Sequence, residues 1–210
     1  MSPVNCGAVS AGSQLGAPRL PQKVKLFAGM LAATEQLLRE GSALLAEAFG
    51  PLDYESPLLP FTYTDYYTAE LGQPLWRQFV SFARLIDPGE LALVKLTTNR
   101  LEQVLAVDGR RRVNIDPGYL SLAKVVLATT KDYSHRLYLG LGIYGEVTLW
   151  YRQGSYQPWP WTYPDYRSQQ YLDTFNQLRA LYARQLKELA AAHLGRAERC
   201  SGAEPTHECS

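Results

Sequence analysis

Residues 87–116 read DPGELALVKLTTNRLEQVLAVDGRRRVNID, and this stretch decides the predicted fold. Its first four residues open a helix, because Asp accepts bonds from free amides, Pro fits the first turn and Glu reaches back. One apolar stripe then recurs at helical spacing, made of Leu91, Val94, Thr98, Leu101 and Leu105. Asp108 and Gly109 end the helix, and residues 112–116 follow as a strand.

The segments before this stretch set the order of the elements. Residues 24–31 form a mostly buried strand, and Thr34 caps a helix that ends at Gly50. Residues 54–59 and 76–86 are two further strands. The order strand, helix, strand, strand, helix, strand is the split βαβ pattern of ferredoxin-like sandwiches, in which helices cover one face of an antiparallel sheet.

The second half of the chain adds more β structure. Residues 124–130 form a strand, and residues 135–139 pair with residues 143–152 as a hairpin. A loop rich in Pro, Trp and Tyr, residues 157–166, precedes a last helix capped by Ser168. We therefore predict an α+β fold: a ferredoxin-like split βαβ sandwich extended by a C-terminal β-hairpin, aromatic loop and helix.

Length and composition predict a single globular domain, residues 23–190. Residues 1–22, rich in small residues and proline, are expected to be a disordered leader, and the polar residues 191–210 a disordered tail. The chain is 46% hydrophobic and 20% charged, which is typical of a soluble protein. Its net charge of +1 gives no global field that would attract nucleic acid or an anionic membrane.

The cysteines and the N-terminus predict a cytoplasmic protein. Cys6, Cys200 and Cys209 are odd in number and close to the termini, which argues against a disulfide framework and for a reducing compartment. No basic region followed by an apolar core marks a secretion signal, and no apolar run approaches the roughly 18 residues that span a bilayer. His207 lies near Cys209 but in the predicted tail, so we predict no metal site.

The strand that ends the opening stretch alternates in polarity. Val113 and Ile115 face one way, and Asn114 and Asp116 face the other. One interpretation is a half-solvated strand that ends in an Asp-Pro-Gly turn. The other is that the two polar side chains project into a cleft, where Asp116 serves as a base or metal ligand and Asn114 orients it. Tyr119, just beyond the predicted turn, is a further candidate.

Residues 129–136, TTKDYSHR, are the densest polar run in the middle of the chain. Lys131, His135 and Arg136 form a set that can bind a phosphate or a carboxylate. His135 is also the natural proton-transfer group near neutral pH. The alternative is a solvated loop whose charges pair locally.

The hairpin permits a prediction of register. If its Gly-Leu-Gly loop has three residues, Tyr138 opposes Tyr144 and Arg136 opposes Glu146. Glu146 is then a structural partner of the arginine, while His135 lies on the opposite face. A loop of two residues would shift the register and break this pairing.

Two aromatic segments complete the candidates. Trp161, Tyr163 and Asp165 belong to a stretch that either packs as a lid over the core or stacks a ring on a base or sugar. Asp65 and Tyr66 lie in a polar-aromatic connection that can face the same cleft. The chain has no P-loop, G-x-G-x-x-G, H-E-x-x-H, C-x-x-C or G-x-S-x-G motif, so these common chemistries are not indicated.

Several segments together resemble a bacterial family of uncharacterised proteins, domain of unknown function 4416. The resemblance covers residues 23–189 and is carried by KLFAG (25–29), TDYY (64–67), LIDPGEL (85–91), VNIDPGYL (113–120), TKD (130–132) with His135 and Arg136, and PWTYPDYRS (160–168). It implies a single-domain bacterial protein. It implies no activity and no cofactor.

The leading hypothesis is a cytoplasmic protein that binds a small phosphorylated ligand or nucleotide in a polar-aromatic cleft, with hydrolase and transferase activity both open. The candidates for proton transfer are Asp116 and His135. The expected ligand-binding residues are Asn114, Tyr119, Lys131, Arg136, Asp65, Tyr66, Trp161, Tyr163 and Asp165. The alternative is a non-enzymatic RNA-binding or protein-interaction module, since ferredoxin-like sheets with exposed rings can stack bases.

Overall fold

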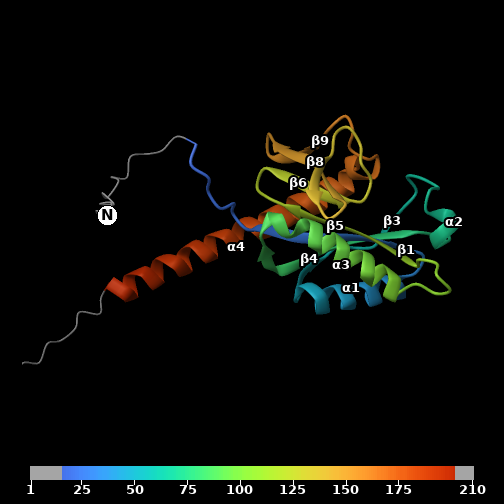
Figure 1. The fold of residues 1–210 in the computed structure, drawn as a ribbon, viewed down its shortest axis with the longest axis horizontal. Helices are drawn as coiled ribbons and strands as arrows, with labels where there is room; N and C mark the ends of the chain where they lie inside the picture. The colour runs from blue at the N-terminus through green and yellow to red at the C-terminus, as the bar shows by residue number, and fades with distance from the viewer. Residues whose placement is uncertain (1–15, 202–210) are drawn as a thin grey trace, which may run out of the picture.

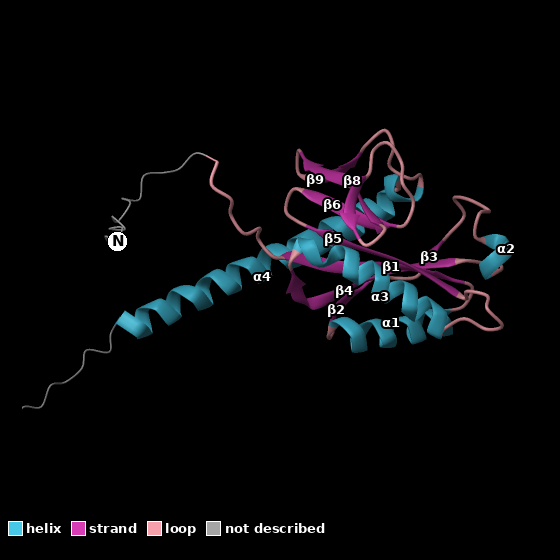
Figure 2. Ribbon diagram, in the orientation of Figure 1, coloured by secondary structure: helices cyan, strands magenta, loops and turns pink. Residues whose placement is uncertain are grey.

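One antiparallel sheet with helices on both faces makes up the fold of the computed structural model, which describes residues 16–201, with side chains for residues 16–192 (Figures 1 and 2). The strands are β1 (Val24–Ala32), β2 (Leu52–Glu55), β3 (Leu59–Pro60), β4 (Trp76–Ile86), β5 (Val113–Leu120), β6 (Lys124–Thr129), β7 (Leu137–Gly140), β8 (Ile143–Arg152) and β9 (Ser155–Pro158). The helices are α1 (Glu35–Phe49), α2 (Thr68–Leu71), α3 (Leu91–Val104) and α4 (Gln169–Ser201), with 3-10 turns at Pro88–Glu90 and Asp165–Arg167.

The strand order of the sheet is β2-β4-β1-β5-β6-β8-β7, with β3 also paired to β4 and β9 also paired to β8. Every pair is antiparallel. The strand β1 lies between β4 and β5, and each of its residues is buried, including Lys25, which forms an ion pair with Asp53. The α+β class is thereby confirmed.

Two cores lie on opposite faces of the sheet. On one face, α1 and α3 bury Leu38, Leu45 and Val94 against the strands. On the other face, α4 buries Phe175 and neighbouring aromatic residues of the same helix against β1 and β4. Figure 1 shows α1 and α3 together on one side and the long α4 crossing the other. Both faces of the central strands are therefore covered.

The predicted helix starts are confirmed. Thr34 accepts a hydrogen bond from the Leu37 amide at 3.3 Å, and Ser168 accepts one from the Tyr171 amide at 3.4 Å. The Asp87 carboxylate accepts from Gly89 while Glu90 reaches back to the Asp87 amide, which completes a capping box. A cap of this kind stabilises a helix by about 1 kcal/mol, so local sequence alone determines where these helices begin.

The turn predicted at Asp-Pro-Gly is wrong, because β5 continues through Pro117 and Gly118 to Leu120. The strand pairs with β1 along its length but with β6 only from Gly118 onward. On the side away from β1, the backbone of Ile115 bonds to side chains of α3. Pro117 shares that side by alternation and has no N–H to leave unpaired. The proline therefore sits where the ladder ends, and β5 and β6 separate there.

The strand predicted at residues 54–59 is two short strands, β2 and β3, which pair with different parts of β4. Pro57 lies between them and interrupts the ladder, because proline cannot donate a backbone hydrogen bond. The strand predicted at residues 76–86 coincides with β4.

The hairpin keeps the predicted pair of Tyr138 and Tyr144, although its loop is shorter than expected. Gly140 opposes Ile143, so only two residues form the loop, and an irregularity between Tyr138 and Gly140 restores the register. The predicted ion pair is confirmed, with Arg136 Nε 2.9 Å from Glu146 Oε2.

The predicted orientation of His135 is wrong. Its Nε2 lies 3.1 Å from the same Glu146 oxygen that binds Arg136, so the two side chains do not face opposite ways. The prediction assumed that side chains alternate between the two faces of a strand that includes His135. The strand β7 begins only at Leu137, so His135 lies in the loop before it, where this alternation does not apply.

At the C-terminus, α4 continues to Ser201, into the segment predicted as a tail. Cys6, His207 and Cys209 lie outside the described residues, as does the side chain of Cys200. No helix within residues 16–201 combines the length and apolar character needed to cross a membrane.

Candidate functional site

A cavity of about 950 Å³ opens where β5 and β6 separate. Strand β5 forms one wall, β6 and the loop before β7 form another, and α3 and the segment around Asp165 close the sides. Nine charged side chains line it: Arg77, Lys95, Arg111, Lys131 and Arg136 as cations, and Glu102, Asp116, Glu146 and Asp165 as carboxylates. The split between the strands thus creates a cleft lined by many charged side chains.

The structure brings most of the predicted site residues to this cavity. Those that line it are Asn114, Asp116, Lys131, Arg136, Tyr66, Tyr163 and Asp165. Asp116 and the loop of residues 131–136, which are distant in sequence, open onto the same space. Their roles in binding or chemistry remain predictions.

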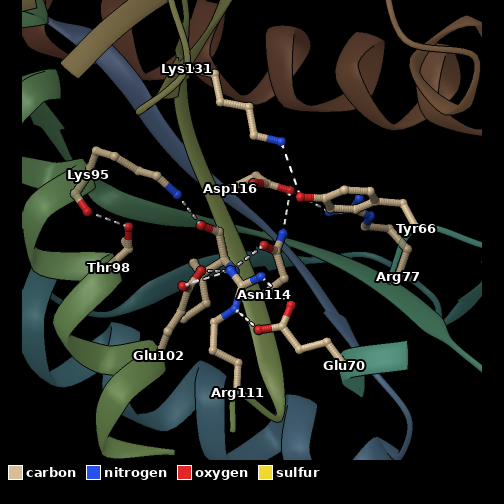
Figure 3. Close-up of polar contacts among 11 residues, drawn as sticks. Tyr66, Glu70, Arg77, Lys95, Thr98, Glu102, Arg111, Asn114, Asp116 and Lys131 are labelled. Atoms are coloured by element: carbon tan, nitrogen blue, oxygen red, sulfur yellow. Dashed lines mark hydrogen bonds and ion pairs between the residues drawn. The ribbon is translucent and has the colours of Figure 1, made fainter. Parts of the chain in front are cut away.

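Asp116 is held at one oxygen and free at the other. Its Oδ2 accepts hydrogen bonds from Asn114 Nδ2 at 2.8 Å and from Arg77 Nη1 at 3.3 Å (Figure 3). Among the described residues, no hydrogen bond reaches its Oδ1, and the side chain is 28% exposed. Asn114 and Arg77 therefore hold one carboxylate oxygen of Asp116, and Oδ1 is left to accept a hydrogen bond from a ligand.

Arg77, on β4, forms the floor of the cavity and is only 2% exposed. Its Nη2 lies 3.5 Å from Asp165 Oδ2, and its guanidinium lies over the rings of Phe61 and Phe79. Burial opposes its charge, but nearby tyrosines and both carboxylates outweigh that effect and raise the pKa of Arg77. Burial raises the pKa of Asp165, and Arg77 partly offsets this. The floor is a buried cation between two carboxylates.

The α3 side of the cavity satisfies the free edge of β5. Glu102 accepts a hydrogen bond from the Ile115 amide at 2.6 Å, and Lys95 donates one to the Ile115 carbonyl at 2.9 Å. Arg111 then joins Glu102, Glu70 and Asn114 (Figure 3). Burial raises the pKa of Glu102, against the opposing effect of Lys95 and Arg111. Side chains of α3 thus replace the missing neighbouring strand.

Lys131 and Arg136, on the opposite wall, differ in how far they are satisfied. Arg136 binds Glu146, the Lys131 carbonyl and the Tyr163 hydroxyl, each at 2.9 Å. Lys131 lies 4.8 Å from the centre of the Tyr66 ring and 3.4 Å from its hydroxyl, and it forms no ion pair within the described part of the chain (Figure 3). Lys131 is the available cation, while Arg136 holds the loop and Tyr163 in place.

Tyrosine rings surround the mouth of the cavity. The four that are exposed and also line it are Tyr63, Tyr66, Tyr133 and Tyr163. Rings in this position present flat apolar faces that can stack on a base or a sugar. Only Tyr66 and Tyr163 were predicted from the sequence.

Trp161 does not line the cavity, and its ring is stacked on other rings of the protein. The ring centroids of Trp161 and His135 are 5.7 Å apart, and those of Trp161 and Trp159 are 5.1 Å apart. The column continues from Trp159 to Trp150 and from His135 to Tyr133. These contacts favour the lid interpretation, in which the aromatic loop packs against the protein itself, although Trp161 stays 39% exposed.

His135, Tyr119 and Asp65 also lie outside the cavity lining. His135 is part of the aromatic column and binds Glu146. Tyr119 packs against the apolar core, and burial raises its pKa. Asp65 is exposed, and its carbonyl accepts from the Thr68 amide.

Sequence reasoning missed Arg77, Lys95, Glu102 and Arg111. One signal for Arg77 is present, since it precedes Phe79 by two residues in a buried strand and so shares its inward face. For Lys95 and Glu102 the signal is weaker, because both lie on the predicted α3 but outside its apolar stripe.

Comparison with known proteins gives one family. Residues 22–182 match the family described as domain of unknown function (DUF4416). Curated proteins and solved structures gave no match to the chain. The matched range contains every residue that lines the cavity.

Proposed function

The chain belongs to the family of domain of unknown function 4416, and we propose that its cavity binds a small phosphorylated ligand such as a nucleotide. The observation that carries this proposal is Lys131, a cation that lines the cavity and has no carboxylate partner among the described residues. A lysine ammonium is a frequent phosphate ligand, because its three donors and its charge act as a compact point charge. The ligand phosphate would bind there.

The tyrosines at the mouth support a ligand with a flat or cyclic part. Tyr66 already lies beneath the Lys131 ammonium, and Tyr163 is fixed by its bond from Arg136. A base or sugar ring bound beside the phosphate would contact these faces. Cavities of several hundred cubic ångströms are typical of small-molecule sites, and 950 Å³ lies at the upper end of that range.

The catalytic part of the proposal rests on Asp116. Its Oδ1 has no partner within the described residues and faces the same cavity as Lys131, so it can accept a proton from a nucleophilic water or hydroxyl. The reaction class would be hydrolysis or group transfer at the part of the ligand beside Asp116. His135, the other proton-transfer candidate, lies outside the lining and supports the loop through Glu146.

Thermal-shift screening against nucleotides and sugar phosphates tests the proposal. A ligand that binds only the folded state raises the melting temperature with its concentration. The stabilisation should be lost in Lys131→Gln and retained in Lys124→Gln, an exposed lysine of β6 that does not line the cavity. Absence of stabilisation by every phosphorylated compound would reject the proposal.

The RNA-binding alternative has less support. An RNA-binding sheet of the ferredoxin-like type stacks bases on an open face, whereas α4 covers the face of the sheet opposite α1 and α3. The tryptophan rings of this region stack on one another. The protein-interaction alternative has one supporting observation, the exposed apolar residues Leu137, Tyr138 and Leu139 on β7 at the end of the sheet.

We also infer that the β2-β4-β1-β5 part of the sheet, with α1 and α3 on one face, is a ferredoxin-like split βαβ unit. The support is its strand order, in which each helix connects two strands separated by a third. For the setting we propose a bacterial cytoplasm, supported by the three sparse cysteines of the chain and by the bacterial family that its motifs resemble.

A further inference from the structure

We infer that the ligand is the phosphate ester of a polyhydroxy compound, a sugar phosphate or nucleotide, and that Asp116 and Arg77 bind one of its hydroxyl groups. This inference rests on the proposed function, because it assumes that the phosphate binds at Lys131. It adds the chemistry of the opposite end of the ligand and assigns Arg77 to binding.

The charges of the cavity are arranged in a way that orients such a ligand. The wall formed by β6, β8 and the loop before β7 carries two cations and one carboxylate, Lys131, Arg136 and Glu146. The floor carries one cation and two carboxylates, Arg77, Asp116 and Asp165. An anionic group is therefore attracted to the first region and repelled by the second. The part of the ligand at the floor should be neutral and polar.

At the floor, an unused acceptor lies beside an underused donor. Asp116 Oδ1 accepts no hydrogen bond from the described residues. Arg77 has five N–H groups, but only two of them reach acceptors, at 3.3 and 3.5 Å, and its Nε has no partner there. A hydroxyl can donate to the carboxylate and accept from the guanidinium at once. An ammonium only donates and a carbonyl only accepts, so a hydroxyl fits best.

A second observation is that a polar group beside the floor also lacks a partner. The hydroxyl of Tyr166, which lines the cavity, is buried without a hydrogen bond from any described residue. Burial raises the pKa of Tyr166 and the Arg77 guanidinium partly offsets this, so the two groups lie close together. Buried polar groups are normally paired, because an unpaired one loses its bond to water without replacement. The floor thus holds more polar groups than it pairs, which favours a hydroxylated guest over an alkyl chain.

Calorimetric titration with three matched probes tests the inference. The probes are ribose 5-phosphate, n-pentyl phosphate, which has the charge without the hydroxyls, and free ribose, which has hydroxyls without the charge. We expect ribose 5-phosphate to bind about 10-fold or more tightly than pentyl phosphate, since a hydrogen bond to a charged group contributes at least that factor. Free ribose should bind more weakly than its phosphate.

Two variants assign the ends of the ligand. Asp116→Ala should weaken ribose 5-phosphate about 10-fold or more and leave pentyl phosphate unchanged, whereas Lys131→Gln should weaken both phosphates. Glu47→Gln, which changes an exposed carboxylate of α1 outside the cavity lining, is the control and should change neither. Circular dichroism confirms that each variant folds.

The possible outcomes separate the two proposals. Equal affinity for the two phosphates, with both weakened in Lys131→Gln, overturns the hydroxyl site and leaves the proposed function standing. Binding of ribose that is lost in Asp116→Ala, without binding of pentyl phosphate, supports the hydroxyl site and overturns the phosphate site. Absence of binding by all three probes overturns both.

Discussion

The free edge of β5 and the opposite wall of the cavity handle charge in contrasting ways. At the edge, Glu102 and Lys95 bind the backbone of Ile115, and Arg111 binds the outer oxygen of the same carboxylate. At the wall, Lys131 reaches only the ring and hydroxyl of Tyr66. The charged groups at the edge of β5 are saturated, meaning that each is bonded to protein partners. Lys131, which has no carboxylate partner among the described residues, lines the open cavity. The degree of saturation therefore separates structural from candidate binding residues, although both line one cavity.

The largest expected effect comes from breaking the saturated edge. Glu102→Ala removes the acceptor of the Ile115 amide and the carboxylate beside the buried Lys95, and it leaves Arg111 with Glu70 alone. We expect a loss of about 3–5 kcal/mol in the free energy of unfolding, because uncompensated buried charges are costly. Urea denaturation measures this. Glu35→Gln, which breaks the exposed pair with Arg39, should cost only about 0.3–0.5 kcal/mol. Similar losses in the two variants would contradict the comparison.

A smaller effect is expected where β5 meets β6, just beyond the point of separation. A Cβ at Gly118 would lie 2.4 Å from the Val126 carbonyl oxygen and 2.6 Å from Phe27 Cζ. Gly118→Ala should therefore force the strands apart and cost about 1–3 kcal/mol, measured by urea denaturation. Gly109→Ala is a poor control because its φ is positive, so Ala123→Ser, in the exposed turn before β6, serves instead. Unchanged stability of Gly118→Ala would mean that the strands pack less closely there.

The pH dependence of stability sharpens the comparison further. Burial raises the pKa of Glu102 above its ordinary value of 4.5, so folding favours its protonated form. Its stabilising contribution is complete below the unfolded pKa and is lost as the pH rises through the folded pKa. Burial also raises the pKa of Asp165 above its ordinary value of 3.8, so its contribution to stability changes with pH in the same direction. From about pH 4 to pH 7, the wild type should lose stability relative to Glu102→Gln. The measurement is the melting temperature of both proteins as a function of pH. An equal change with pH in the wild type and in Glu102→Gln would contradict this assignment.

The smallest effect on stability is expected at Lys131. Lys131→Gln removes an exposed cation without an ion pair among the described residues, so the free energy of unfolding should stay within about 0.5 kcal/mol of the wild type. Chemical denaturation in the absence of ligand measures this. A large loss of stability would place Lys131 with the structural charges and remove the observation that carries the proposed function.

Much of the fold follows from short-range rules that sequence patterns express directly. Thr34 and Asp87 cap helices because each side chain bonds to an amide two or three residues away. The Arg136–Glu146 pair was predictable because this hairpin places the two residues, which are ten apart in sequence, opposite each other. Lys131 and Asp116 were predicted to lie at one cleft because of their positions at strand ends. Asp116 ends one predicted strand, and Lys131 follows another.

Other features depended on partners far along the chain, which no local pattern contains. Arg77 lies beside Asp116 and Asp165, 39 and 88 residues away, so nothing near it in sequence marks it as the floor of a cavity. Trp161 was expected to reach a ligand, but it stacks on His135 and Trp159 and does not line the cavity. The sequence by itself determined the helix starts, the apolar strands and the class of side chain at the site. Only the tertiary structure decided that Pro117 marks the end of the pairing between β5 and β6 and makes no turn. The physical reason is that the effect of the missing proline N–H depends on whether a neighbouring strand lies opposite it.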